Sequence, residues 1–213
     1  MNMNEGTVAI LIQWSLLCLV WMGSFDLQLR NMKMERRRVL AVISAFLICT
    51  FVSWEIYFAP IQVSLSGTIL PLIASIILYT KLTSKIRRLY LLSALATALL
   101  LFWLRWLFFT DPILLFWDER IIVPAVGVST IFLMSRTYLG QLFQLTLSMP
   151  LADAIHSLYF WKMSGSCHWG SEYAQDLLWS SLSLWALVSL VWSAIRRILG
   201  RTETESSHSD TGR

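Results

Sequence analysis

Residues 89–109 read LYLLSALATALLLFWLRWLFF, and this stretch decides the fold class. It holds a single charged residue, Arg105. A helix of about 20 mostly apolar residues crosses the hydrocarbon core of a membrane and satisfies its own backbone polar groups there. Over all 213 residues, 56% are hydrophobic and 14% are charged, against about 45–50% and 25% in soluble proteins. This excess excludes a soluble enzyme, a large domain outside the membrane and a disordered scaffold.

Seven segments of this kind predict an all-α transmembrane helix bundle. They form one domain over residues 1–199, and the polar residues 200–213 predict a disordered tail. Gly67 and Pro71 predict a kink in the third segment. The predicted spans are 7–25, 39–59, 63–79, 89–109, 121–139, 142–161 and 177–199.

The positions of Lys and Arg orient these spans. With the N-terminus outside, 14 of the 17 basic residues fall in the inner loops and the tail. Two basic residues, Arg120 and Lys162, then lie outside, and Arg105 lies within a span. Basic loops face the cytoplasm in membrane proteins, so we predict an outside N-terminus and a cytoplasmic C-terminus. Anionic lipid accounts for the basic loops, which favours the lipid bilayer over nucleic acid as the partner.

Four ionisable residues within the spans are the first candidates for a functional site: Glu55, Arg105, Asp153 and His156. A charge costs about 2.5–3.5 kcal/mol at the centre of an inserted helix, so such residues mark functional sites by default. At about 1.5 Å per residue, all four fall in the outer half of the bundle. Asp153 and His156 are three residues apart and share one helix face. This pattern predicts a polar cavity that opens to the outside.

The loop after the fourth span adds Asp111, Asp118, Glu119 and Arg120 on the same side. The cavity would bind an ion or pass a proton between Asp153 and His156. A purely structural interpretation is also open. In that interpretation Glu55 pairs with Arg105, and His156 hydrogen-bonds to Asp153.

The sequence motifs predict no cofactor, no metal site and no catalytic residue. There is no glycine-rich phosphate loop, no zinc-binding spacing and no Gly-x-Ser-x-Gly turn for a serine nucleophile. Three cysteines without close spacing form neither a disulfide framework nor a metal set. Cys167 falls in a predicted outer loop, where its thiol would contact external solvent.

These observations favour a non-catalytic membrane protein that acts by interaction, assembly or regulation, with other membrane proteins or with itself. A first alternative is a permease for a small molecule or ion that uses the outer polar cavity. A second is an intramembrane enzyme that acts on lipid headgroups near Asp153 and His156.

The segment PILLFWDERIIVP, residues 112–124, has Pro112, Leu114, Phe116, Asp118 and Arg120 at alternate positions. Together with the chain length and the basic loop after the first span, it resembles the YphA-like small integral membrane proteins of spore-forming bacteria. The resemblance implies a bacterial cytoplasmic membrane and carries over no activity and no site residue.

Overall fold

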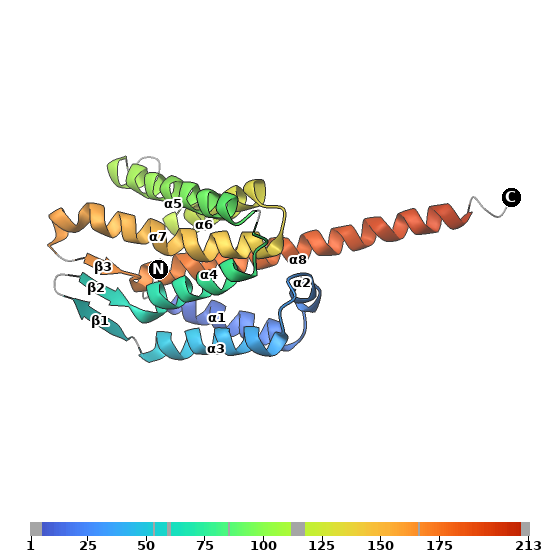
Figure 1. The fold of residues 1–213 in the computed structure, drawn as a ribbon, viewed down its shortest axis with the longest axis horizontal. Coiled ribbons are helices and arrows are strands. Elements are labelled where there is room, and N and C mark those ends of the chain that lie inside the picture. Colours follow the sequence, from blue (N-terminus) through green and yellow to red (C-terminus); the bar gives the residue numbers. More distant parts are fainter. Residues whose placement is uncertain are drawn as a thin grey trace.

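The computed structural model describes residues 6–52, 54–58, 61–84, 86–111, 118–165 and 167–209. Long helices lie side by side in a bundle, and a small sheet covers one of its ends (Figure 1). The order is α1 (Thr7–Trp21), α2 (Asp26–Asn31), α3 (Arg36–Val52), β1 (Glu55–Phe58), β2 (Ile61–Ser64), η1 (Leu65–Ile69), α4 (Leu70–Lys81), α5 (Arg87–Thr110), α6 (Glu119–Met134), α7 (Tyr138–Ser164), β3 (Cys167–Trp169) and α8 (Glu172–Ser209).

The seven longer helices correspond in order to the seven predicted spans, and α2 is a short addition in the first basic loop. Within the described residues, α5 and the Glu172–Ile195 part of α8 are long and apolar enough to cross a membrane. Thr7–Trp21 and Leu65–Lys81 are shorter apolar helices. The third predicted span contains a π-helical turn, η1, just before Pro71, where the sequence predicts a kink.

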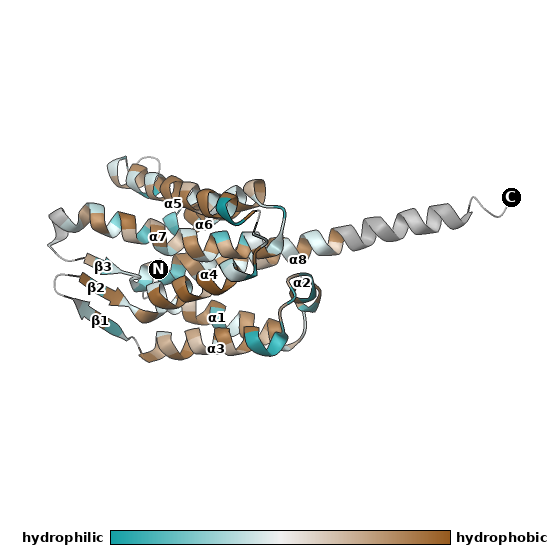
Figure 2. Cartoon of the chain, viewed as in Figure 1, coloured by the Kyte–Doolittle hydropathy of each residue, from teal (hydrophilic) through white to brown (hydrophobic). Residues whose placement is uncertain are grey.

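The bundle has apolar side chains on its surface and many polar side chains inside. Leu92, Trp103 and Leu133 are among the exposed apolar residues, whereas Gln13, Gln144 and Ser181 are buried. Brown, hydrophobic positions recur along the helices of the bundle in Figure 2, with white and teal positions between them. In lipid, polar side chains are stable when they face other helices, so this arrangement suits a bundle surrounded by hydrocarbon.

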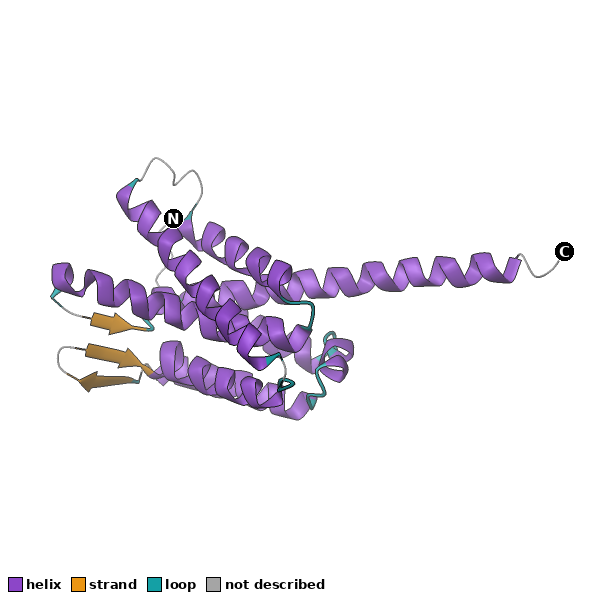
Figure 3. Cartoon of the chain, turned by 45° about the horizontal axis from the view of Figure 1, so that its top comes forward, coloured by secondary structure: helices purple, strands orange, loops and turns teal. Residues whose placement is uncertain are grey.

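The second and third predicted spans need correction where they meet. α3 ends at Val52, and Glu55–Phe58, predicted as helix, instead form β1, which pairs antiparallel with β2. The first two residues of the third predicted span, 63 and 64, belong to β2. β3 then pairs parallel with β2, which gives the sheet order β1-β2-β3 seen in Figure 3. Ile56, Tyr57 and Val63 are β-branched or aromatic residues that favour strands, and the distant β3 supplies a pairing partner that the local sequence does not reveal.

The two ends of the bundle differ in charge. The sheet end carries β1–β3, the start of α6 and the start of α8. The opposite end, here called the basic end, carries α2, the start of α3, the end of α4, the start of α5 and the connection after α6. These segments, with the turn after α2, hold most of the described Lys and Arg residues. There, Arg87 donates hydrogen bonds to the carbonyl oxygens of Thr80 and Leu82 at 2.7 and 2.8 Å. A guanidinium in this position stabilises the C-terminus of α4.

α8 extends well beyond the bundle at the basic end (Figure 1). The sequence predicts a disordered tail from residue 200, but the structure continues the helix to Ser209. Adding residues to a formed helix is far easier than starting one, so a polar segment can remain helical after an apolar one. Residues 210–213 of the predicted tail lie outside the described part of the chain.

Two glycines bring η1 and the turn after β3 into backbone contact. A Cβ at Gly67 would overlap the carbonyl group of Gly170, and a Cβ at Gly170 would overlap Thr68 and Gly67. Gly170 also has a φ of 71°, which L side chains rarely adopt. The sheet end therefore depends on two positions that only glycine fits.

We expect Gly170→Ala to destabilise the protein more than Gly165→Ala. Both residues have nearly the same positive φ, 71° and 73°, but a Cβ at Gly165 would meet no atom within 4 Å. Gly165→Ala is the control, and it loses only the tolerance of glycine for this left-handed backbone conformation, about 1–2 kcal/mol of the free energy of unfolding. Gly170→Ala adds a further loss of about 1–3 kcal/mol from overpacking. Thermal unfolding in detergent measures both. Equal losses would contradict the proposed close contact.

Candidate functional site

The site is built around Arg105, near the end of α5. Its Nε donates to Oε1 of Glu119 on α6 at 2.9 Å, and its Nη1 donates to Oδ1 of Asp153 on α7 at 3.2 Å. The side chains of Arg105 and Asp153 are only 9% and 7% exposed, and that of Glu119 is 25% exposed. One guanidinium thus joins three helices. Charge-assisted hydrogen bonds of this kind are about twice as strong as neutral ones.

The second carboxylate oxygen of Asp153 joins the sheet end to the same group. Oδ2 accepts a hydrogen bond from the backbone N–H of Gly170 at 2.9 Å, in the turn between β3 and α8. Tyr173 follows on α8, and the guanidinium carbons of Arg105 and Arg120 lie 5.5 and 5.4 Å from its ring centroid. Both distances suit cation–π attraction.

Asp176 connects this group to the first helix. Its two oxygens accept hydrogen bonds from the backbone N–H groups of Gly6 and Ala9 at 3.1 and 2.8 Å. Arg120 lies 4.0 Å from the same carboxylate. A carboxylate at a helix N-terminus satisfies free N–H groups and interacts favourably with the helix dipole. Asp176 of α8 therefore holds the start of α1 in place.

Of the residues predicted within the spans, the structure brings together Arg105 and Asp153. His156 lies nearby on α7, where its ring contacts that of Phe160 at 4.6 Å, and it makes no hydrogen bond to Asp153. Glu55 is in a different place from the one predicted. It is exposed on β1 and accepts a hydrogen bond from the Tyr57 hydroxyl at 2.9 Å, so the Glu55–Arg105 pair of the structural interpretation does not form. The Glu55 hydrogen bond and charge raise the pKa of Tyr57.

The four loop candidates also separate into two groups. Glu119 and Arg120 belong to the cluster around Arg105 because α6 begins there. This cluster, here called the Arg105 group, consists of Arg105, Glu119, Arg120, Asp153, Tyr173 and Asp176. Asp118 accepts a hydrogen bond from the backbone N–H of Arg120 and caps α6, and Asp111 is exposed after the end of α5. Residues 112–117 of the PILLFWDERIIVP segment lie outside the described residues.

Three partners at this site were not among the sequence candidates: Gly170, Tyr173 and Asp176. The sequence carries no signal for Asp176, because it lies beyond the first turn of α8 and caps α1, which is distant in the chain. A backbone N–H and an aromatic face carry no such signal either. Cys167 corrects another prediction, since its thiol is buried on β3 and not exposed to solvent.

The Arg105 group is closed and well satisfied. The cavity beside it, lined by residues that include Leu101, Met149 and Ala174, measures about 10 Å³, which is room for about one water molecule. Within the described part of the chain, no three His, Cys, Asp or Glu side chains gather as metal ligands. Among the described residues, the side chains around Arg105 hold helices together, and the cavity beside them is too small for an organic substrate.

Comparison with known proteins identifies the family. The model of the YphA-like integral membrane proteins matches residues 6–211. The chain belongs to this family. The resemblance seen in the sequence is confirmed, and the protein resides in a membrane. No curated protein and no solved structure matches this YphA-like chain.

We expect Arg105→Gln to destabilise the protein by about 3–5 kcal/mol, because it leaves the buried carboxylate of Asp153 without its cation. Asp153→Asn should cost less, because Glu119 still pairs with Arg105. The double variant should lose less than the sum of the two single losses. Thermal unfolding of the four proteins in detergent measures the coupling. Arg120→Gln is the matched control, because Arg120 is more exposed and 4.0 Å from its carboxylate. Strictly additive losses would contradict the ion pair.

Proposed function

We propose that this YphA-like protein is a non-catalytic component of the bacterial cytoplasmic membrane. It crosses the membrane seven times, with its N-terminus outside, and acts by interaction, assembly or regulation with other membrane proteins or with itself. The sheet end then faces outward and the basic end faces the cytoplasm. The observation that carries the proposal is the Arg105 group, in which every charge has a protein partner and the adjoining space is filled.

The match in number and order between the long helices and the apolar segments supports seven crossings. The gathering of Lys and Arg at one end supports the orientation. α8 connects both ends, since it begins beside Asp153 and continues past the basic end. A helix of this form would extend from the bundle toward cytoplasmic partners.

Neither alternative function gains support from the geometry of the site. A permease needs a path or cavity beside its charged residues, and the space beside Arg105 is about 10 Å³. An enzyme that acts on headgroups needs an acid or base within reach of its substrate. Asp153 has both oxygens occupied, by Arg105 and by Gly170.

Cysteine labelling in intact cells tests the orientation. We expect Asp111→Cys, at the sheet end, to react with a membrane-impermeant maleimide, and Arg136→Cys, at the basic end, to react only after permeabilisation. The wild-type chain is the control, because Cys167 is buried and Cys18 and Cys49 lie within apolar helices. Labelling of Arg136→Cys in intact cells would contradict the proposed topology.

A second experiment separates a structural role of the Arg105 group from transport or catalysis. Removing all the charges of a buried ion pair is often neutral for stability. The combined variant Arg105→Met, Asp153→Asn, Glu119→Gln should therefore accumulate normally, because the amide oxygen at position 153 can still accept the N–H of Gly170. We expect cells with this variant to have the same metabolite and lipid profiles as wild-type cells. Profiles that match a gene deletion, at a normal protein level, would instead support a carrier or an enzyme.

A further inference from the structure

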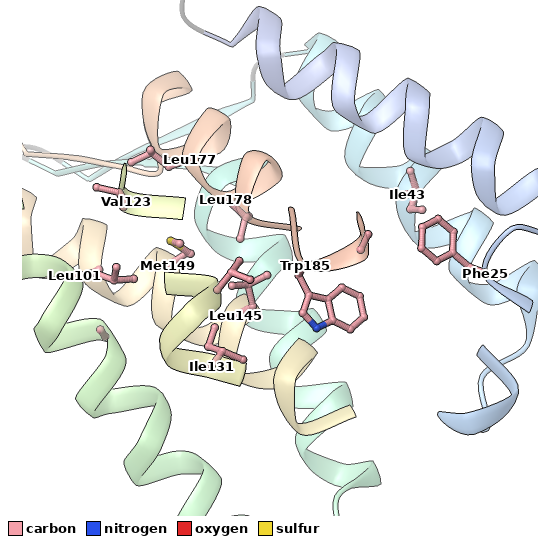
Figure 4. Close-up of a cluster of buried hydrophobic side chains, with 14 of the residues drawn as sticks. Phe25, Ile43, Leu101, Val123, Ile131, Leu145, Met149, Leu177, Leu178 and Trp185 are labelled. Carbon is pink, nitrogen blue, oxygen red and sulfur yellow. The ribbon is translucent and has the colours of Figure 1, made fainter. Parts of the chain in front are cut away.

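A cavity lined mainly by apolar side chains lies near the basic end, away from the Arg105 group. It measures about 200 Å³ and is lined by α1, α2, α3, α4, α7 and α8. Figure 4 shows Phe25 and Ile43 set apart from the other labelled core residues, with Trp185 on the side that faces them; all three line the cavity. A cavity of about 150 Å³ binds benzene, so this one takes on the order of eight carbon atoms on the same scale.

The cavity is elongated along the helices. Its α8 wall runs from Leu178 to Ala186, which is about 12 Å at 1.5 Å per residue. Its α3 wall runs from Val39 to Phe46, about 10 Å by the same measure. Phe46 and Trp179 pack edge to face at 5.2 Å and close the end nearer the sheet. The long axis of the cavity therefore runs parallel to the lipid chains around the bundle.

The cavity also opens sideways toward lipid. Val42 on α3 and Ile77 on α4 line it, and they are 45% and 50% exposed at the bundle surface. Apart from the side chains of Gln28 and Thr146 and the indole N–H groups of two tryptophans, Trp179 and Trp185, the lining consists of hydrocarbon, thioether or aromatic groups. A flexible chain can therefore enter from the membrane without crossing a polar barrier.

Polar and basic groups lie at the end opposite Phe46 and Trp179. Gln28 of α2 lines the cavity, is 2% exposed, and its Oε1 has no hydrogen-bond partner. An amide can present either its carbonyl oxygen or its NH₂ group to a ligand. Residues 26–38 around it carry five basic side chains and two acidic ones. A basic cluster beside the membrane attracts anionic headgroups, at about 1 kcal/mol per Lys or Arg.

We propose that this cavity binds one acyl chain of an anionic phospholipid. The chain enters between α3 and α4 and lies along α8. The glycerol and ester region lies near Gln28, and the headgroup lies against the basic residues of α2 and the start of α3. The site is separate from the Arg105 group, and the proposal goes beyond the non-catalytic role above without depending on it or on the orientation.

Photolabelling of the full chain in lipid nanodiscs tests the proposal. The probes are phosphatidylglycerol and phosphatidylcholine, each with a diazirine on one acyl chain, and mass spectrometry locates the labelled residues. We expect the anionic probe to label the cavity walls at 39–46, 71–78 and 178–186. The zwitterionic probe should label these walls several-fold less. Equal labelling by the two probes, or labels confined to lipid-facing residues such as Trp103 and Leu133, would overturn the proposal.

A filled cavity provides the matched comparison. Ala74→Phe places a ring in the cavity and should reduce wall labelling by at least about tenfold, because burial of several methylene groups is lost. Ala96→Phe makes the same change on an exposed part of α5, and its cavity walls should be labelled to the same extent as those of the wild type. Undiminished labelling of Ala74→Phe, or protein–protein crosslinks through the walls, would overturn the site. If Ala74→Phe does not fold, the comparison of the two probes on the wild type still tests the proposal.

Discussion

The contact of Arg105 with Glu119 and Asp153 holds the sheet end together. A guanidinium in a medium of low polarity is stable only when carboxylates neutralise it and accept its hydrogen bonds. Here α6 and α7 supply those carboxylates, and Asp153 in turn accepts the N–H of Gly170 ahead of α8. The cost of one buried charge thus fixes how four helices meet, and the close approach of Gly67 and Gly170 is set within that frame.

The sequence alone identifies residues whose burial in lipid is costly. Charges are costly in lipid, so Arg105 and Asp153 stood out as residues that require partners, and the structure pairs them. The partner predicted for Arg105 in the structural interpretation was Glu55, on the basis of equal depth. That depth assumed that Glu55 lies in a helix, whereas α3 ends at Val52 and Glu55 lies on β1. Depth also does not tell which direction a helix faces.

The errors around Glu55 and Cys167 share one cause. Apolar runs predict spans by length and hydropathy, and both tests are passed by a helix followed directly by strands of aromatic and β-branched residues. β2 pairs with β3, more than 100 positions later in the chain, and no local pattern encodes that partner. Once β3 forms against β2 and α7, Cys167 is enclosed, although its sequence surroundings are those of a loop.

The two ends of the bundle differ in how completely they are filled. The filled sheet end suits a structural role, and the basic end suits the binding of a ligand. At the sheet end, polar groups meet polar groups and about 10 Å³ remains. At the basic end, apolar walls enclose about 200 Å³ with the unpartnered Oε1 of Gln28 beside it. An empty cavity of that size is costly, because its lining loses dispersion contacts. In a membrane the nearest material that restores those contacts is a lipid chain. A ligand therefore gains most by binding in the cavity near the basic end, and not at the Arg105 group.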